Sequence, residues 1–376
     1  MSAVPAKWPL TRLGDICEFK YGKSLPETAR AGGDISVFGS NGIVGAHNSA
    51  LTNGPTIVIG RKGSHGEVNF SPASCWPIDT TYYVDRSATK ADIRWLFHRL
   101  CGAGLNQMNR AAAVPGLNRE DAYRVEILLP TLEEQRRIAA ILDQAETLRT
   151  QRRTALALLD SLTQSLFLDM FGDPAINQKG WEVKTIEELC EVKGGKRLPK
   201  GAEYSPTPTP HRYIRVTNLS NGQVDQSQLL YLTPEIQKSI GRYIVNTGDV
   251  IISIAGSIGL VAPVPASLDG ANLTENAAKL VQRRDGNYLP DFLAFMLGTK
   301  AIQDQIQSHV GQVTIGKLAL FRIEKLTIPL PPLPLQQTFA TRIASIQALK
   351  ATHRRALAAL DALFASLQQR AFAGQL

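Results

Sequence analysis

The sequence of 376 residues has only four cysteines and six histidines, and it contains neither a CxxC nor an HxxxH pair. A structural zinc site therefore has no support, and we predict no metal site. Single thiols scattered over a chain of this length are typical of a reducing compartment. The most apolar stretch, residues 250–266, is broken by glycines and prolines and predicts buried strands rather than a membrane span. Residues 1–15 have no apolar signal core, so we expect a soluble, cytoplasmic protein.

Signatures of catalysis are also missing. Residues 22–24 (Gly-Lys-Ser) look like the end of a phosphate-binding loop, but the glycine required five residues earlier is Cys17. The sequence has no GxGxxG after a strand, no Asn/Asp-Pro-Pro-aromatic tetrapeptide, no complete nuclease pattern and no Gly-x-Ser-x-Gly. We therefore predict that this chain has no catalytic residues of its own.

The charge of the chain is moderately positive. Lys and Arg number 41 against 33 Asp and Glu, which gives a net charge of +8, while 44% hydrophobic and 20% charged residues are typical of a globular protein. A positive surplus favours an anionic partner, nucleic acid first and an acidic membrane surface second. Residues 332–376 hold five cations and one Asp, so a net +4 of this surplus belongs to one segment.

An internal repeat is the strongest signal in the sequence. Three segments of the first half recur in the second half, 173, 193 and 201 residues later: residues 8–26 match 181–199, residues 57–66 match 250–259, and residues 129–135 match 330–336. The offset only grows, so the second copy carries insertions, one of them in the proline-rich loop 205–211. Cys17 and Cys190 occupy equivalent apolar segments, which predicts two buried thiols.

Each copy ends in a long helical pattern of about 40 residues, which spans about 60 Å. Apolar heptads of this length indicate a coiled coil. We predict that the two helices pair antiparallel, with Arg152 near His353, although two ordinary amphipathic helices in separate cores remain an alternative. The predicted seam consists of Ile138, Ile141, Leu148, Arg152, Leu159, Leu162, Leu166, Phe339, Ile346, Leu349, His353, Leu360, Leu363 and Leu367.

These patterns predict an α+β protein with two pseudo-repeated globular domains separated by two long helices that pack as an antiparallel coiled coil. The expected boundaries are residues 1–130 and 173–331 for the globular domains, and 131–172 and 332–376 for the helices.

Candidate binding residues gather in loops at equivalent places of the two copies. A glycine-rich turn after each β-branched run suits close approach to a phosphate, although a plain hairpin turn explains the glycines of a single copy as well. Asn, Gln and Arg fit base edges, and Lys and Arg fit phosphates. In the first copy the candidates are Lys20, Tyr21, Lys23, Arg61, Lys62, Ser64, His65, Asn106, Gln107, Asn109, Arg110, Asn118 and Arg119. In the second copy they are Lys193, Lys196, Arg197, Lys200, Ser257, Gln307, His309, Gln312, Thr314 and Lys317.

The order of globular domain, long helix, globular domain and long helix resembles the specificity subunit of type I restriction–modification systems. The matching features are the Trp-led openings, the Gly-Ser-x-Gly turns, and residues 129–138 (Leu-Pro-Thr-Leu-Glu-Glu-Gln-Arg-Arg-Ile) at the head of the first helix. The counterpart at residues 330–336 has Leu335-Gln336 where the family usually has Glu-Gln.

This resemblance implies a non-catalytic DNA-binding subunit. Each globular domain would be a target recognition domain for one half of a bipartite, asymmetric sequence. The helices would set the spacing of the half-sites and dock two modification subunits. Cofactors would belong to the partners: S-adenosylmethionine to the adenine-methylating subunits, and ATP with Mg²⁺ to a restriction subunit.

Two alternatives come from other classes of protein. One is a stand-alone methyltransferase or nuclease with unrecognised motifs, which methyl transfer by the isolated chain would reveal. The other is a coiled-coil scaffold whose domains bind protein, for which DNA affinity would not respond to salt.

Overall fold

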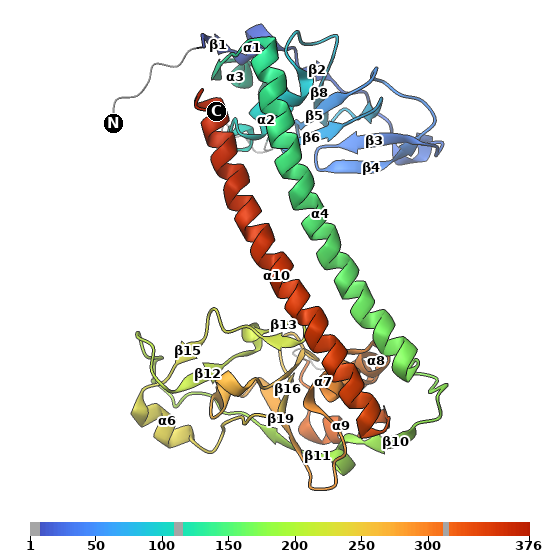
Figure 1. The fold of residues 1–376 in the computed structure, drawn as a ribbon, viewed down its shortest axis with the longest axis vertical. Helices are drawn as coiled ribbons and strands as arrows, with labels where there is room; N and C mark the ends of the chain where they lie inside the picture. The colour runs from blue at the N-terminus through green and yellow to red at the C-terminus, as the bar shows by residue number, and fades with distance from the viewer. Residues whose placement is uncertain (1–7, 109–115, 311–315) are drawn as a thin grey trace. The chain divides into compact units, whose positions relative to one another are not determined.

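The computed structural model describes residues 8–108, 116–310 and 316–376 (Figure 1). The chain divides into two compact units. Unit 1 comprises Met1–Leu156 and Thr352–Leu376, and unit 2 comprises Ala157–Ala351. Each unit therefore combines one strand-rich region with part of both long helices, α4 (Leu132–Phe171) and α10 (Leu333–Phe372).

Unit 1 contains a four-stranded sheet of order β2-β8-β5-β6, a three-stranded sheet of order β4-β3-β7, and the pair β1-β9. Its strands are β1 (Leu10–Arg12), β2 (Lys20–Tyr21), β3 (Ile35–Gly39), β4 (Gly42–His47), β5 (Thr56–Gly60), β6 (Val68–Ser71), β7 (Trp76–Pro77), β8 (Thr81–Asp85) and β9 (Glu126–Leu128). Its shorter helices are α1 (Leu13–Ile16), α2 (Ile93–Cys101) and α3 (Arg119–Tyr123), with 3₁₀ turns η1 (Glu27–Ala29) and η2 (Leu105–Gln107).

Unit 2 repeats this plan with sheets of order β11-β19-β16-β17 and β15-β12-β18 and the pairs β10-β20 and β13-β14. Its strands are β10 (Glu182–Thr185), β11 (Cys190–Gly194), β12 (Arg212–Ile214), β13 (Leu219–Ser220), β14 (Gln223–Val224), β15 (Leu230–Tyr231), β16 (Val250–Ser253), β17 (Val261–Pro263), β18 (Asn272–Leu273), β19 (Ala277–Gln282) and β20 (Thr327–Leu330). Its shorter helices are α5 (Ile186–Leu189), α6 (Pro234–Ile240), α7 (Pro290–Gly298), α8 (Lys300–His309) and α9 (Leu320–Glu324), with 3₁₀ turns η3 (Val216–Asn218) and η4 (Ala266–Leu268).

The repeat seen in the sequence is a repeat of topology. In both three-stranded sheets the central strand pairs antiparallel with one neighbour and parallel with the other. The central strands β5 and β16 are buried on both faces, which explains their uninterrupted β-branched composition. Gly22 and Gly195 sit at equivalent turns, and a Cβ on either would lie 2.1 Å from a backbone carbonyl oxygen. Only glycine fits at these two positions.

The long helices run antiparallel, as predicted. In unit 1 the first part of α4 lies beside the last part of α10 (Figure 1), and Arg152 Nη1 lies 3.3 Å from His353 Nδ1. In unit 2 the last part of α4 lies beside the first part of α10, and Lys350 Nζ lies 2.8 Å from the Asp160 carboxylate. The first long helix ends at Phe171, where Gly172 adopts a φ of +79° and Pro174 follows.

The predicted seam is wrong at four of its leucines, which all occupy the same position of the heptad. Leu148, Leu162, Leu349 and Leu363 are 41–51% exposed. The inward positions are instead one residue later: Arg149, Thr163, Lys350 and Phe364. Burial agrees with the prediction at the other position of the heptad, which includes the fully buried Ile138 and Phe339. The pattern of leucines misplaces the seam because three of the four inward residues are polar.

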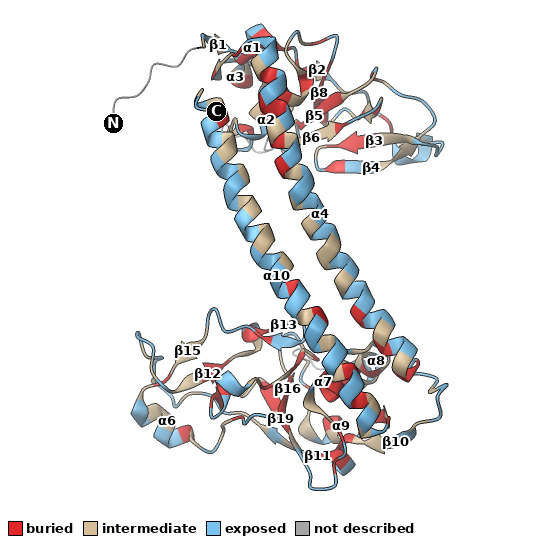
Figure 2. Ribbon diagram, in the orientation of Figure 1, coloured by how far each residue is buried: buried red, intermediate tan, exposed pale blue. Residues whose placement is uncertain are grey.

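Each unit has its own hydrophobic core, which includes residues of both long helices (Figure 2). In unit 1, Ile138 and Leu142 of α4 and Ala371 of α10 are buried in the core. In unit 2, the core contains a group of aromatic rings from α4, α7 and α10: Phe167, Phe171, Phe292, Phe295 and Phe339. Cys17 and Cys190 are buried as predicted, and burial raises their thiol pKa values to about 12 and about 11.

A buried glutamine occupies the same place at the head of each long helix. Gln135 Oε1 accepts a hydrogen bond from the N–H of Asp92, the N-cap of α2, at 2.7 Å, and its Nε2 donates to Pro130 O at 2.9 Å. Gln336 makes the equivalent bonds to Leu289 N–H, the N-cap of α7, and Pro331 O, both at 2.8 Å. The second copy therefore keeps this contact despite its altered Leu335-Gln336 sequence. Among the described helices, none is long and apolar enough to cross a membrane.

Candidate nucleic-acid interface

In unit 1, one backbone carbonyl accepts the hydrogen bonds that hold the start of the turn after β5. Thr80 O accepts hydrogen bonds from the N–H groups of Arg61 and Lys62 at 2.9 and 3.2 Å, and from the Ser40 hydroxyl at 2.7 Å. Lys62 also forms a β-bridge with Gly116. The first two residues after the strand are therefore held by their backbones, and the side chain of Lys62 is exposed.

Gly66 closes this turn. Its N–H donates to Gly60 O at 2.8 Å, and its φ of +76° is in the left-handed region. A Cβ here would lie 2.2 Å from the backbone nitrogen of Asn106, so glycine allows the turn to pack against η2. The structure thus brings the predicted Asn106 and Gln107 next to the turn, where both are exposed, as is Ser64.

Three predicted residues of unit 1 meet in what we call the Tyr21 cluster, which consists of Tyr21, Arg61, Tyr82 and Arg119. The guanidinium carbons of Arg61 and Arg119 each lie 5.3 Å from the centre of the Tyr21 ring, which is 53% exposed. Arg61 Nη2 also donates to Asp79 O at 2.6 Å. Burial, together with the neighbouring Tyr21, raises the pKa of Tyr82 to about 12, so this phenol stays neutral. Two guanidinium groups on one aromatic ring offer donors suited to phosphate oxygens or to guanine.

Some polar side-chain nitrogens in and around this cluster are not satisfied. Within the described residues, Arg61 Nε, Arg119 Nε and His65 Nε2 are buried without a hydrogen-bond partner. Arg119 Nε lies 3.6 Å from the Glu120 carboxylate, and His65 Nδ1 lies 3.3 Å from Gly63 O. A buried donor without an acceptor costs about 1–3 kcal/mol, so acceptors brought by a ligand would be stabilising here.

The two predicted lysines of the first basic turn lie apart from the cluster. Lys20 points to the opposite face of β2, where its Nζ donates to Asp85 at 3.4 Å and to Ser87 at 2.5 Å. Against the effect of burial, the Ser87 hydrogen bonds and the charge of Lys20 lower the pKa of Asp85. Lys23 Nζ lies 6.0 Å from the ring of Trp76. Lys20 is therefore occupied within the protein, whereas Lys23 is exposed.

Asn118 has a structural role that the sequence prediction did not foresee. Its Oδ1 accepts from Glu120 N–H at 2.8 Å and caps α3, the helix that begins with Arg119. The predicted Asn109 and Arg110 lie outside the described residues.

Unit 2 repeats the backbone of the turn. Asn276 O accepts from the N–H groups of Ile254 and Ala255 at 2.8 and 3.3 Å, and Ala255 forms a β-bridge with Lys317. In unit 1 the same positions are held, in the same order, by Thr80, Arg61, Lys62 and Gly116.

The side chains on this shared backbone are different. In unit 2, Gly194, Ile254 and Leu320 stand where unit 1 has the phenol and the two guanidinium groups of the Tyr21 cluster. A Cβ on Gly194 would lie 3.7 Å from Leu320 Cδ1, and Ile254 is buried. The two units therefore present different chemistry at equivalent places.

The predicted cations of unit 2 lie on or near β11. Lys193 pairs with Glu191 at 2.5 Å, and Arg197 Nε donates to Glu275 at 2.7 Å. Lys196 Nζ lies 5.8 Å from the ring of Tyr243. The other predicted residues of unit 2 are spread out. Lys200, Ser257 and Gln307 are exposed, His309 ends α8, Lys317 lies in the β-bridge, and Gln312 and Thr314 lie outside the described residues.

The sequence prediction missed a cleft of about 380 Å³ in unit 2. Arg197, Tyr204, Arg215 and Asn276 are among its lining residues. Arg215 Nη2 donates to Gln228 O at 3.0 Å, while its Nε is buried without a partner in the described part of the chain. One signal could have revealed this residue, because Arg215 interrupts the apolar run of residues 213–216.

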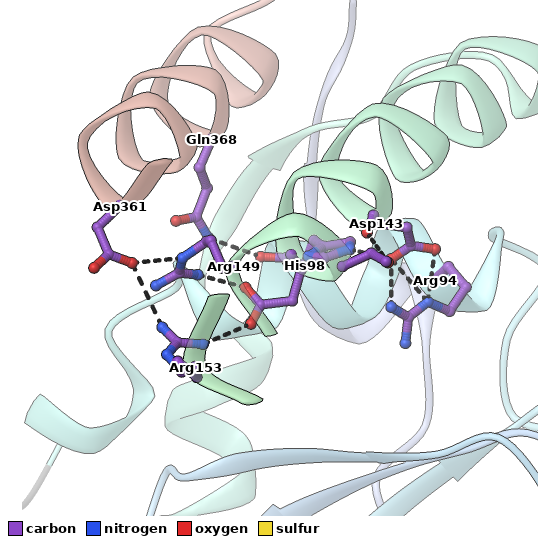
Figure 3. A network of polar contacts seen from close by, with 9 residues as sticks. Arg94, His98, Asp143, Arg149, Arg153, Asp361 and Gln368 are labelled. Carbon is purple, nitrogen blue, oxygen red and sulfur yellow. Dashed lines mark hydrogen bonds and ion pairs between the residues drawn. The ribbon is translucent and has the colours of Figure 1, made fainter. Parts of the chain in front are cut away.

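A polar network attaches α2 to both long helices within unit 1 (Figure 3). The Asp143 carboxylate on α4 accepts from Arg94 and, at 2.7 Å, from His98 Nε2. Burial lowers the pKa of His98 more than the neighbouring Asp143 raises it. Against the effect of burial, the hydrogen bonds from Arg94 and His98 lower the pKa of Asp143.

The network continues from α4 to α10. Arg149 Nε donates to Asp361 at 2.6 Å (Figure 3). The Arg149 guanidinium lies 4.5 Å from the ring centre of Phe364. Gln368 Nε2 then donates to the backbone carbonyl of His98 at 3.3 Å. These contacts hold the sheet region of unit 1 on its two helix segments.

Comparison with known proteins places this architecture in a class of DNA-recognition proteins. The family described as "Type I restriction modification DNA specificity domain" matches residues 5–157 and 178–361. These two ranges correspond to the two copies of the repeat and together cover most of the chain. The chain belongs to this family.

Individual relatives agree with this assignment. The chain is 24% identical to the EcoBI specificity subunit of Escherichia coli over 336 residues, which cover 78% of this chain and 68% of the relative. It is 20% identical to the MjaVIII specificity subunit of Methanocaldococcus jannaschii over 385 aligned positions, which cover 92% of this chain and 87% of the relative. The fold matches a crystal structure of a type I system S subunit from M. genitalium with a TM-score of 0.67 and 14% identity, over 98% and 97% of the two chains.

Proposed function

We propose that this chain is the DNA-specificity subunit of a type I restriction–modification complex and is itself not catalytic. The observation that carries this proposal is the family match to both copies of the repeat. We assign one half of a bipartite target to residues 1–130 and the other half to residues 173–331. The shared turn backbone with exchanged side chains supports two different half-sites, and hence an asymmetric target.

In this proposal the Tyr21 cluster contacts the first half-site. Its guanidinium groups rest on an exposed ring, and unit 2 has apolar residues at the equivalent positions. Arginine presents paired donors to the O6 and N7 acceptors of guanine, and Arg61 is held for this role by its own backbone and by Asp79 O.

The partners in this proposal are double-stranded DNA, two modification subunits and a restriction subunit. Leucines that the coiled-coil seam leaves exposed support docking of proteins along the helices. They are Leu148, Leu158, Leu162, Leu349 and Leu363. S-adenosylmethionine would belong to the modification subunits, and ATP with Mg²⁺ to the restriction subunit.

A domain exchange tests the assignment. Residues 1–130 are replaced by the matching region of a relative with a known target, and the chain is expressed with its modification subunits. We expect sequencing of methylated bases to show one half of the target changed and the other half intact. The reverse exchange of residues 173–331 serves as the control. A change in both halves, or methylation independent of this chain, would contradict the proposal.

A further inference from the structure

Unit 2 has a second cleft, of about 360 Å³, with a cationic lining. Lys193 on β11 and Lys279 on β19 are directly opposite in the strand register and therefore share one face of the sheet. Arg242, which follows α6, completes a set of three cations around the cleft, and Tyr243 lines it as well. No carboxylate is among its lining residues in the described part of unit 2.

Tyr243 forms an aromatic platform in this cleft. Its backbone is held by Leu273 N–H, which donates to Tyr243 O at 3.0 Å. The Arg242 guanidinium lies 4.9 Å from the ring centre and donates to the phenol oxygen at 2.8 Å. Lys196 Nζ lies 5.8 Å from the same ring. Two cations thus lie at the Tyr243 ring, and Lys193 and Lys279 line the same cleft.

The nearby acids neutralise only part of this charge. Lys279 pairs with Asp249 at 3.4 Å, and the two side chains are only 12% and 6% exposed. Lys193 pairs with Glu191, but its side chain remains 54% exposed, so water screens this pair strongly. No ion pair within the described residues involves Arg242 or Lys196. The open part of the cleft therefore keeps a positive charge.

The described residues of unit 1 do not repeat this set of cations. Lys20 stands at the position of Lys193 and is paired with Asp85, and the residue opposite it in the strand register is Tyr83 rather than a lysine. A common structural requirement of the fold would have kept the cations in both copies. Their restriction to unit 2 points to a ligand.

We infer that this cleft binds a backbone phosphate of DNA beside the half-site assigned to unit 2. This inference rests on the proposed function. Ammonium and guanidinium groups suit phosphate oxygens, and the cleft offers few of the amide groups that read base edges. Phosphate contacts position a protein on the duplex without reading its sequence. The cleft therefore anchors unit 2 while other residues discriminate bases.

The salt dependence of DNA binding tests this inference. The double variant Lys193→Gln/Arg242→Gln leaves the buried pair of Lys279 with Asp249 intact. Its matched control, Lys238→Gln/Arg284→Gln, removes the same charge from exposed positions of unit 2 outside the cleft. Each full-length chain is assembled with its modification subunits, and its affinity for a random-sequence duplex is measured over a salt series. We expect the slope of log K against log[salt] to become less steep by about 0.9 for each phosphate that the variant no longer neutralises.

The control should keep the wild-type slope, and the methylated sequence should be the same for all three proteins. A wild-type slope in the cleft variant, or a changed recognition sequence, would overturn the phosphate assignment alone. A wild-type complex whose affinity is flat in salt would instead overturn the proposed function. Inorganic phosphate is added at constant ionic strength in a second arm. If it displaces DNA from the wild type more readily than from the variant, inorganic phosphate and the DNA backbone compete for this cleft, as the inference requires. Equal displacement from both proteins would show that the cleft holds no DNA phosphate.

Discussion

Lys20 and Tyr21 are neighbours on β2, yet their surroundings are opposite. The sequence predicts DNA contacts for both because both belong to a basic turn. The alternation of the strand directs Tyr21 to two arginines and Lys20 to Asp85 and Ser87. The sequence indicates which segment is concerned, but partners that are 40 or more residues away decide which side chain remains available.

His98 gives the stability of unit 1 a dependence on pH. Its pKa lies below the ordinary value of 6.5 because the ring is buried. The unfolded chain therefore binds a proton more readily, so the stabilising contribution is complete above pH 6.5 and decreases as the pH falls below it. We expect the free energy of unfolding, measured in urea, to fall more between about pH 7 and about pH 5 in the wild type than in His98→Gln.

The variant keeps a donor for Asp143 but has no titrating ring. His211→Gln, at a less buried histidine, serves as its control and should behave like the wild type. If the free energy of unfolding of His98→Gln depended on pH as much as that of the wild type, the buried imidazole would not be the source of the pH dependence.

At the scale of elements, the long helices show which features of the fold can be predicted from the sequence. Their length, their antiparallel direction and the contact of Arg152 with His353 follow from apolar periodicity and duplication. The end of the first one follows from Gly172 and Pro174. The exposure of the four leucines Leu148, Leu162, Leu349 and Leu363 does not follow. Arg149 reaches Asp361 and Phe364, and Lys350 reaches Asp160, so polar residues take places that a heptad of leucines assigns elsewhere.

The candidate site also combines features that the sequence predicts with features that it does not. The glycine-rich turns and their equivalence are predictable because tight turns depend on local residue types. The cationic cleft cannot be predicted from the sequence in this way. Lys279 lies beside Lys193 only because β19 pairs with β11, and Arg242 is placed by a β-bridge after α6.

The buried glutamines at the helix heads are the element-scale contact with the clearest energetic consequence. Gln135→Ala leaves the Asp92 N–H and the Pro130 carbonyl unsatisfied in a buried place. We expect a loss of about 1–3 kcal/mol in the free energy of unfolding and faster hydrogen exchange at the Asp92 amide. The exposed Gln337→Ala is the control and should change neither quantity. Unchanged exchange at Asp92 in Gln135→Ala would contradict this role.

At the scale of the whole molecule, the helices link half-site recognition to spacing, if the proposed function holds. Inserting seven residues at equivalent places of α4 and α10 preserves the heptad and adds about 10 Å of helix, the length of about three base pairs. We expect sequencing of methylated bases to show a longer unread spacer and unchanged half-sites. Insertion into only one helix is the control, and it should abolish methylation because the paired helices no longer match. An unchanged spacer after the double insertion would show that the helices do not set it.

The first and last described segments of the chain meet in unit 1. A Cβ on Gly374 would lie 3.6 Å from the indole of Trp8, and Arg137 Nη2 donates to the backbone carbonyl of Leu376 at 2.8 Å. Gly374 and Trp8 are close enough to be joined by a short linker, and the chain can be opened instead in the exposed turn of residues 173–180. The segments would then follow one another in a different order along a circularly permuted chain with the same contacts.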